Sequence, residues 1–260
     1  MRLLLPFILL CFTGMIQAQN RVSESNQIGW LSTMGTIQLS QKFAFQPEVQ
    51  WRRTNWITSP QQDLYRFGFQ YAAHPAVWFR AGYAYIETYH YGTFPLNSMG
   101  KNFSEHRIQV AVLLNSRFAD RLDMQQRIMG EYRWVGAYSN PTLQVEDKWN
   151  QMYRLRYQLR MQLPLQGPTL DPKEWYIATW NELFVGLGKN VNKNTWDQNR
   201  FAALLGYRIH PNLRIEGGFF SQIVQLGRED ALGRNIFQYN NGYTLQTFWN
   251  LDLRRKKTNG

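Results

Sequence analysis

Apolar and polar residues alternate along most of the chain with the period of two that a β-strand shows when its faces meet different surroundings. The cleanest run extends from Tyr153 to Leu163, where tyrosine, leucine and methionine alternate with arginine and glutamine. Similar runs occupy residues 43–52, 105–115, 213–223 and 245–252, with weaker ones at 65–71, 77–86, 122–134 and 201–209. Apolar residues do not recur at helical spacing over any long stretch. We therefore expect an all-β protein.

Short and long connections alternate between these runs. The short ones carry turn residues at 74–75, 118–120 and 210–212, and the long polar ones cover 91–103, 136–148, 186–198 and 226–238. A membrane-crossing meander has short turns on the periplasmic side and longer loops outside. The connection 164–173 falls among the short turns and is longer than this pattern predicts.

The pattern contains about eleven candidate strands of roughly 10–14 residues, a length that suits a tilted strand crossing a bilayer. Single-chain bacterial barrels have even strand numbers. We therefore expect about ten to twelve strands and favour twelve, with residues 21–42 supplying two of them. The predicted fold is an antiparallel, up-and-down transmembrane β-barrel over residues 19–253, with a polar lumen rich in arginine and glutamate.

A soluble secreted β-protein, such as a sandwich or a lipocalin-like barrel, would also alternate. The polarity of the two faces separates the alternatives, because a soluble barrel has an apolar inside and many lysines outside. Here arginine, glutamate and glutamine lie opposite large aromatic residues, and lysine is scarce within the strands. Tyr83, Tyr132 and Trp175 stand near strand ends, where an interfacial aromatic girdle would place them. This pattern favours the membrane barrel.

The first eighteen residues have the organisation of an export signal. Arg2 is followed by an apolar stretch from Leu3 to Ile16 and by the small residue Ala18 before Gln19. The chain's single cysteine, Cys11, lies in this segment. We expect residues 1–18 to be cleaved and the remainder to become an integral protein of the cell outer membrane. Its expected partners are outer-membrane lipid and, during insertion, the barrel-assembly machinery.

Several short polar motifs fall on or next to the predicted strands. They are Glu105-His106-Arg107, Arg127 with Glu131 and Arg133, Arg154-x-Arg156-Tyr157, Asn181-Glu182, Asp197-Gln198-Asn199-Arg200 and Gly206-Tyr207. Together they resemble the uncharacterised outer-membrane β-barrel proteins of Gram-negative bacteria that are grouped only as a domain of unknown function. The resemblance covers nearly the whole mature chain. It implies a barrel in the outer membrane and implies no activity.

Net charge is +11, from 29 Lys and Arg against 18 Asp and Glu. The arginines are dispersed, and the only basic run lies in the C-terminal tail 254–260, so we expect no nucleic-acid partner. We place the strand charges inside the barrel instead, where arginine can bridge carboxylates on neighbouring strands and avoid the cost of isolated buried charge. The predicted luminal network comprises Glu48, Arg66, Arg80, Glu105, Arg107, Arg127, Glu131, Arg133, Arg154, Arg156, Arg160, Glu182, Arg200, Arg214 and Glu216.

These residues suit two functions. One is a structural or interaction barrel with a lumen filled by side chains and long loops offered to a ligand outside the cell, and this is the interpretation we favour. The alternative is a narrow anion-preferring channel or solute-binding barrel, because arginines outnumber carboxylates in the set. A more distant alternative is a lipid hydrolase or acyltransferase using Ser104 and His106. We expect no catalytic residues, no cofactor and no metal site, and the oligomeric state is open.

Overall fold

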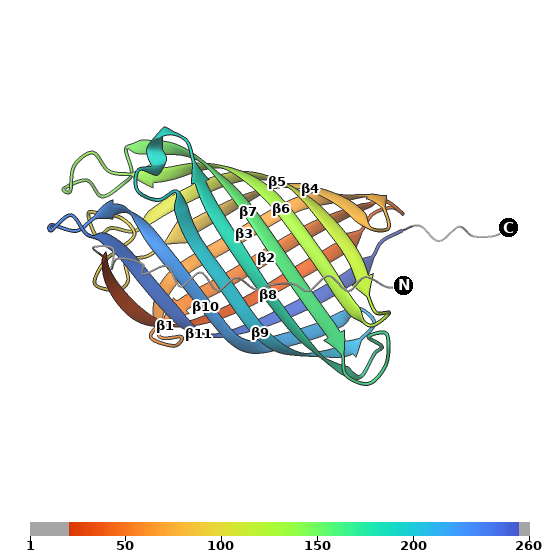
Figure 1. Ribbon diagram of the computed structural model, residues 1–260. Helices are drawn as coiled ribbons and strands as arrows, with labels where there is room; N and C mark the ends of the chain where they lie inside the picture. The colour runs from red at the N-terminus through yellow and green to blue at the C-terminus, as the bar shows by residue number, and fades with distance from the viewer. Residues whose placement is uncertain (1–20, 255–260) are drawn as a thin grey trace, which may run out of the picture.

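The computed structural model describes residues 21–254, which form one closed β-barrel of eleven strands (Figure 1). The predicted export signal, residues 1–18, and all but Arg254 of the predicted basic tail lie outside the described residues. The strands are β1 (Arg21–Gln38), β2 (Phe43–Thr54), β3 (Ser59–His74), β4 (Val77–Thr88), β5 (Phe103–Phe118), β6 (Leu122–Ala137), β7 (Lys148–Pro164), β8 (Glu174–Leu187), β9 (Trp196–His210), β10 (Leu213–Glu229) and β11 (Asn235–Asp252).

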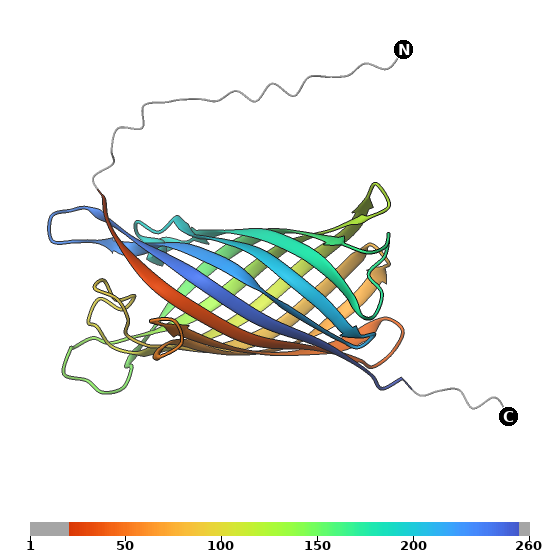
Figure 2. The same ribbon diagram turned by 90° about the horizontal axis from the view of Figure 1, so that it is seen from below.

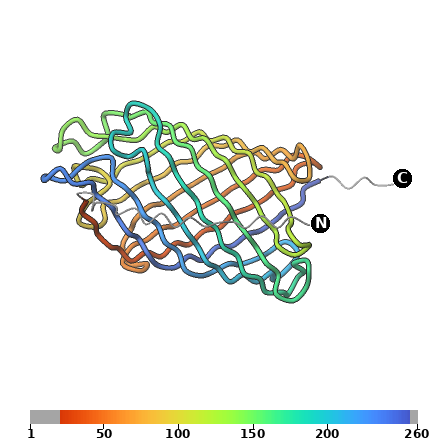
Figure 3. The backbone as a smooth tube through the Cα atoms, in the orientation of Figure 1, coloured from red at the N-terminus to blue at the C-terminus, as the bar shows by residue number. Residues whose placement is uncertain are grey.

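Each strand pairs antiparallel with its neighbours in the sequence, and the barrel is closed by a parallel pairing of β1 with β11. Figure 2 shows β1 and β11 running side by side, and Figure 3 shows how steeply all strands are tilted. A single 3-10 turn, Lys189–Val191, is the helical segment of the described chain. Within residues 21–254, no helix is long and apolar enough to cross a membrane.

The favoured count of twelve strands is wrong. Residues 21–42 do not split in two, because β1 is one strand of 18 residues that pairs with β11 from Arg21 to Gln38 without interruption. With an odd number of alternating strands, the first and the last run in the same direction. The closing pair is therefore parallel, and the barrel departs from the wholly antiparallel arrangement that we expected.

The two ends of the barrel differ in the length of their connections. At the long-loop end lie residues 55–58, 89–102, 138–147, 188–195 and 230–234, and at the short-turn end lie residues 39–42, 75–76, 119–121, 165–173 and 211–212. The long connection among the short turns has a structural reason. Leu170 packs against the buried cluster that contains Trp30 and Trp180, and Arg208 donates to the carbonyl oxygen of Leu170 at 2.5 Å. This connection therefore folds back into the lumen.

The wall is apolar outside and largely polar inside. Val110, Phe69 and Tyr153 are 58%, 57% and 54% exposed on the outer face. Charged residues of the same strands, such as Glu131 and Arg154, are buried on the inner face. The face assignment made from the alternation therefore matches the structure, and the protein is inverted relative to a soluble barrel.

Candidate functional site

Glu131 is the centre of an ion-pair network inside the barrel. It comes from β6 and receives Arg154 and Arg156 from the adjacent β7, with N–O distances of 2.6 Å and 2.7 Å. Arg154 continues to Asp197 of β9 at 2.6 Å, and Arg156 continues to Glu182 of β8 at 2.7 Å. Period-two alternation makes this possible, because residues 154 and 156 share the inner face of one strand.

The network extends in both directions around the wall. Glu105 of β5 forms an ion pair with Arg107 at 2.5 Å. It also accepts hydrogen bonds from two nitrogens of Arg133, at 2.5 Å and 3.0 Å. On the other side Arg127 reaches Glu182 at 2.6 Å. The carboxylates alternate with guanidinium groups, so each buried charge faces opposite charge. The network occupies the half of the lumen nearest the long loops.

Aromatic rings compensate arginines that have no carboxylate. Among the described residues, Arg52 and Arg200 form no salt bridge, and both lie over the ring of Trp30, at 4.0 Å and 5.1 Å from its centroid. Arg200 also lies 4.7 Å from the centroid of Phe184. These cation–π contacts supply negative potential where carboxylates are missing. Aromatic rings thus lie beside these two arginines in place of carboxylates.

Residues 89–102, which connect β4 and β5 and which we call the lid, close the long-loop end. Glu24 of β1 accepts hydrogen bonds from the backbone nitrogens of Thr93 and Phe94, the shortest at 2.6 Å. Tyr91 donates to Gln238 at 2.9 Å, and Arg228 donates to two lid carbonyl oxygens. Phe94 and Leu96 pack against an apolar cluster of β10 and β11. The lid therefore crosses from one side of the mouth to the other.

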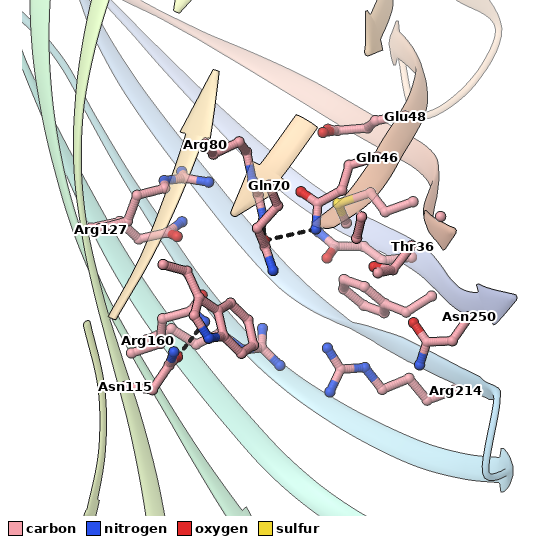
Figure 4. Close-up of a pocket in the computed structure, with 18 of the residues that line it drawn as sticks. Thr36, Gln46, Glu48, Gln70, Arg80, Asn115, Arg127, Arg160, Arg214 and Asn250 are labelled. Atoms are coloured by element: carbon pink, nitrogen blue, oxygen red, sulfur yellow. Dashed lines mark hydrogen bonds between the residues drawn. The ribbon is translucent and has the colours of Figure 1, made fainter. Parts of the chain in front are cut away.

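A cavity of about 880 Å³, which we call the chamber, occupies the other half of the lumen (Figure 4). Residues of the short-turn end, including Gln41 and Pro211, contribute to its lining. Arginines predominate among its charged residues, which are Lys42, Glu48, Arg52, Arg66, Arg80, Arg117, Asp123, Arg127, Arg156, Arg160, Glu182, Arg200, Arg208 and Arg214. The expectation of a lumen filled by side chains is therefore wrong for this half. Inward-pointing glycines such as Gly68 leave part of the wall without side chains.

All residues of the predicted luminal network lie buried or half-buried on the inner side of the wall. The structure joins most of them into the network above, while Arg66 pairs with Glu48 at 2.8 Å and Arg160 pairs with Glu216 at the short-turn side. Arg80 and Arg214 have no carboxylate among the described residues. The prediction missed Arg52, although it continues the polar face of β2, and Asp197, which follows a loop where alternation carries no information.

Ser104 and His106, the pair named for the lipid-hydrolase alternative, have separate hydrogen-bond partners. The hydroxyl of Ser104 donates to Glu146 at 3.1 Å, and Nδ1 of His106 lies 2.5 Å from the hydroxyl of Tyr83. His106 also lies among the aromatic rings of Tyr85 and Trp149. In the described chain, no hydrogen bond joins Ser104 to His106, and no group of His, Cys, Asp and Glu residues has the arrangement of a metal site.

Two loop aspartates hold the turns of the long-loop end. Hydrogen bonds from Ser139 lower the pKa of Asp147 below its ordinary value, and hydrogen bonds from Arg234 lower the pKa of Asp230 in the same way. A carboxyl with a depressed folded-state pKa stabilises its loop above its ordinary pKa and loses this contribution only as the pH falls through the lowered value. Both loops therefore keep these contacts at neutral pH.

The fold and the site define a closed, eleven-stranded β-barrel with an apolar exterior, a lid at one end and an arginine-rich chamber in the other half. The family model described as protein of unknown function (DUF2490) matches residues 27–232, and the chain belongs to this family. The match runs from β1 to the connection after β10. Comparison with curated proteins and with solved structures found no match.

Proposed function

We propose that this protein is exported by a cleaved N-terminal signal and spans the outer membrane of a Gram-negative bacterium. The chamber in its lumen, open at the short-turn end only, would bind anionic solutes. The chamber would open to the periplasm, because short turns face the periplasm in outer-membrane barrels and long loops face outward. Enzymatic activity forms no part of this proposal.

The inverted polarity of the barrel is the observation that carries the membrane assignment. Side chains such as Phe67, Ile108 and Leu183 are exposed around the wall, while the ion pairs are inside. Exposed apolar surface on this scale is unfavourable in water and is covered by lipid in a bilayer. A closed barrel also satisfies its backbone hydrogen bonds without water.

The chamber supports binding over a purely structural role. Its volume of about 880 Å³ lies within the range of pockets that hold small molecules, roughly 300–1,000 Å³. The lid and the ion-pair network fill the other half, which argues against a continuous aqueous path. The solute-binding alternative therefore accounts for the chamber, and the favoured structural or interaction role does not.

Fractionation of cells that express the full chain tests the membrane assignment. We expect the protein in the outer-membrane fraction, and we expect unheated samples to migrate faster than boiled samples on a detergent gel, because a closed barrel stays compact until heat unfolds it. Recovery from the soluble periplasmic fraction would contradict the proposal and favour a secreted lipocalin-like protein.

A further inference from the structure

Arg80 of β4 differs from the other arginines that line the chamber. Arg214 lies over the ring of Phe248, 4.4 Å from its centroid, and Arg208 donates to two backbone carbonyl oxygens. Arg80 has neither kind of partner nor a carboxylate in the described residues; its hydrogen bond goes to the side-chain oxygen of Gln70, at 2.9 Å. A half-buried guanidinium with one neutral acceptor leaves donors that a further acceptor can satisfy.

Two more guanidinium groups border the same part of the chamber. Arg66 lies on the adjacent strand, and Figure 4 shows Arg127 beside Arg80, with Arg214 on the opposite side of the cavity. The Nε–H groups of Arg66, Arg80 and Arg127 are buried and have no acceptor. The Nδ2 of Asn115, on the same lining, is also an unpartnered donor. Among the buried, unpartnered side-chain atoms of this lining in the described chain, these four are donors and one, Oε1 of Gln109, is an acceptor.

Two glycines lie on the inner wall next to Arg80. Gly68 lies on the inner face of β3, between Arg66 and Gln70. It is paired with Gly82 of β4. A Cβ at either glycine would lie 2.5 Å from a backbone oxygen of the neighbouring strand, so the wall between the arginine side chains stays bare. Part of the wall between Arg66, Arg80 and Gln70 therefore carries no side chain.

We propose that the chamber binds a compact oxyanion, a phosphate or carboxylate group of a small solute, between Arg80 and Arg127, with Arg66 on its third side. This inference rests on the proposed function and names the chemistry of its ligand. Guanidinium groups match the geometry of both groups through paired N–H donors. Arg127 and Arg66 keep their pairs with Glu182 and Glu48, and Arg80 supplies the unpaired charge.

Calorimetric titration of the folded full-length barrel in detergent tests this site. The probes are sodium phosphate and sodium citrate at constant ionic strength, with sodium chloride as reference. We expect saturable binding of at least one probe, and we expect Arg80→Gln to weaken it by about ten- to a hundredfold. Arg80→Gln is expected to fold, because Arg80 forms no salt bridge among the described residues and Glu48 keeps its ion pair with Arg66 at 2.8 Å. Arg80→Lys, which keeps the charge and loses the fork, is expected to weaken binding less.

Arg234→Gln is the matched control, because it removes the same charge from a loop at the opposite end and should leave binding unchanged. No binding beyond chloride to a barrel that is folded and inserted would overturn the oxyanion site and leave the membrane assignment standing. Equal binding by wild type and Arg80→Gln would also overturn it, since the anion would then lie elsewhere. Comparison of phosphate with citrate identifies which oxyanion group the site accepts.

Discussion

At the scale of single residues, the centre of the luminal network depends on carboxylates that each pair with more than one arginine, namely Glu105, Glu131 and Glu182. Glu131 illustrates this arrangement, because its two oxygens receive Arg154 and Arg156 from the neighbouring strand. Removing a buried carboxylate leaves its arginines charged and without compensation, which costs more than the pair itself contributes. The stability of the barrel should therefore be sensitive to the acidic members of the network.

We expect Glu131→Gln to lower the free energy of unfolding by about 3–5 kcal/mol, as is typical when one member of a buried ion pair is removed. Urea unfolding of the barrel in lipid vesicles, followed by the change in gel migration, measures this effect. Asp123→Asn is the control, because Asp123 pairs with Arg117 on a partly exposed site and the loss should be about 0–1 kcal/mol. Equal losses in the two variants would contradict a buried network.

At the scale of the strand, a single strand faces two different environments, one on each of its faces. In β7, Leu155 is exposed on the outer face while its neighbour Arg156 is buried in the ion-pair network. Under the proposed membrane assignment, a substitution would act through lipid contact at one position and through charge pairing at the next.

Leu155→Lys should prevent stable insertion, with a cost of about 2–4 kcal/mol for lysine near the middle of a bilayer. The fraction of barrel that folds into lipid vesicles measures this, and Leu155→Met is the control that keeps the apolar surface. Arg156→Gln should insert and lose stability through the network instead. Normal insertion of Leu155→Lys would show that this face does not meet lipid.

Alternation predicted the strands and their faces well, because period two reports directly on which side a residue occupies. It could not decide whether the barrel has ten, eleven or twelve strands, because residues 21–42 alternate weakly. The rule that single-chain bacterial barrels have even strand numbers favoured twelve, which is wrong. Nor could it find Asp197, whose role comes from an ion pair between β7 and β9, the two strands on either side of β8. The chamber was equally hidden, because a filled and an empty lumen use the same residue types.

At the scale of the whole molecule, the two halves of the lumen have different contents. Ion pairs and the lid occupy the half at the long-loop end, and the chamber occupies the half at the short-turn end. Under the proposed function, this division would give a solute access to the chamber from one side and leave no water path from end to end.

Single-channel recording in planar bilayers should accordingly show little or no steady conductance for the wild-type protein. The physical reason is the buried ion-pair network around Glu131 and the lid above it. Large anion-selective steps that disappear in a variant lacking Arg154, Arg156 and Arg160 would make the narrow channel the correct interpretation.

The parallel pairing of β1 with β11 also bears on how the barrel is assembled. The hydrogen bond between Asn26 and Asn240 joins residues separated by 214 positions, so this seam has nearly the largest sequence separation the barrel can contain. Contacts of high sequence separation form slowly, because the entropy of closing so long a segment must be overcome first. Until β11 has been made and docked, the sheet has two unpaired edges that invite pairing with other chains. Pairing of β11 with β1 is therefore the event that turns an aggregation-prone sheet into a closed barrel.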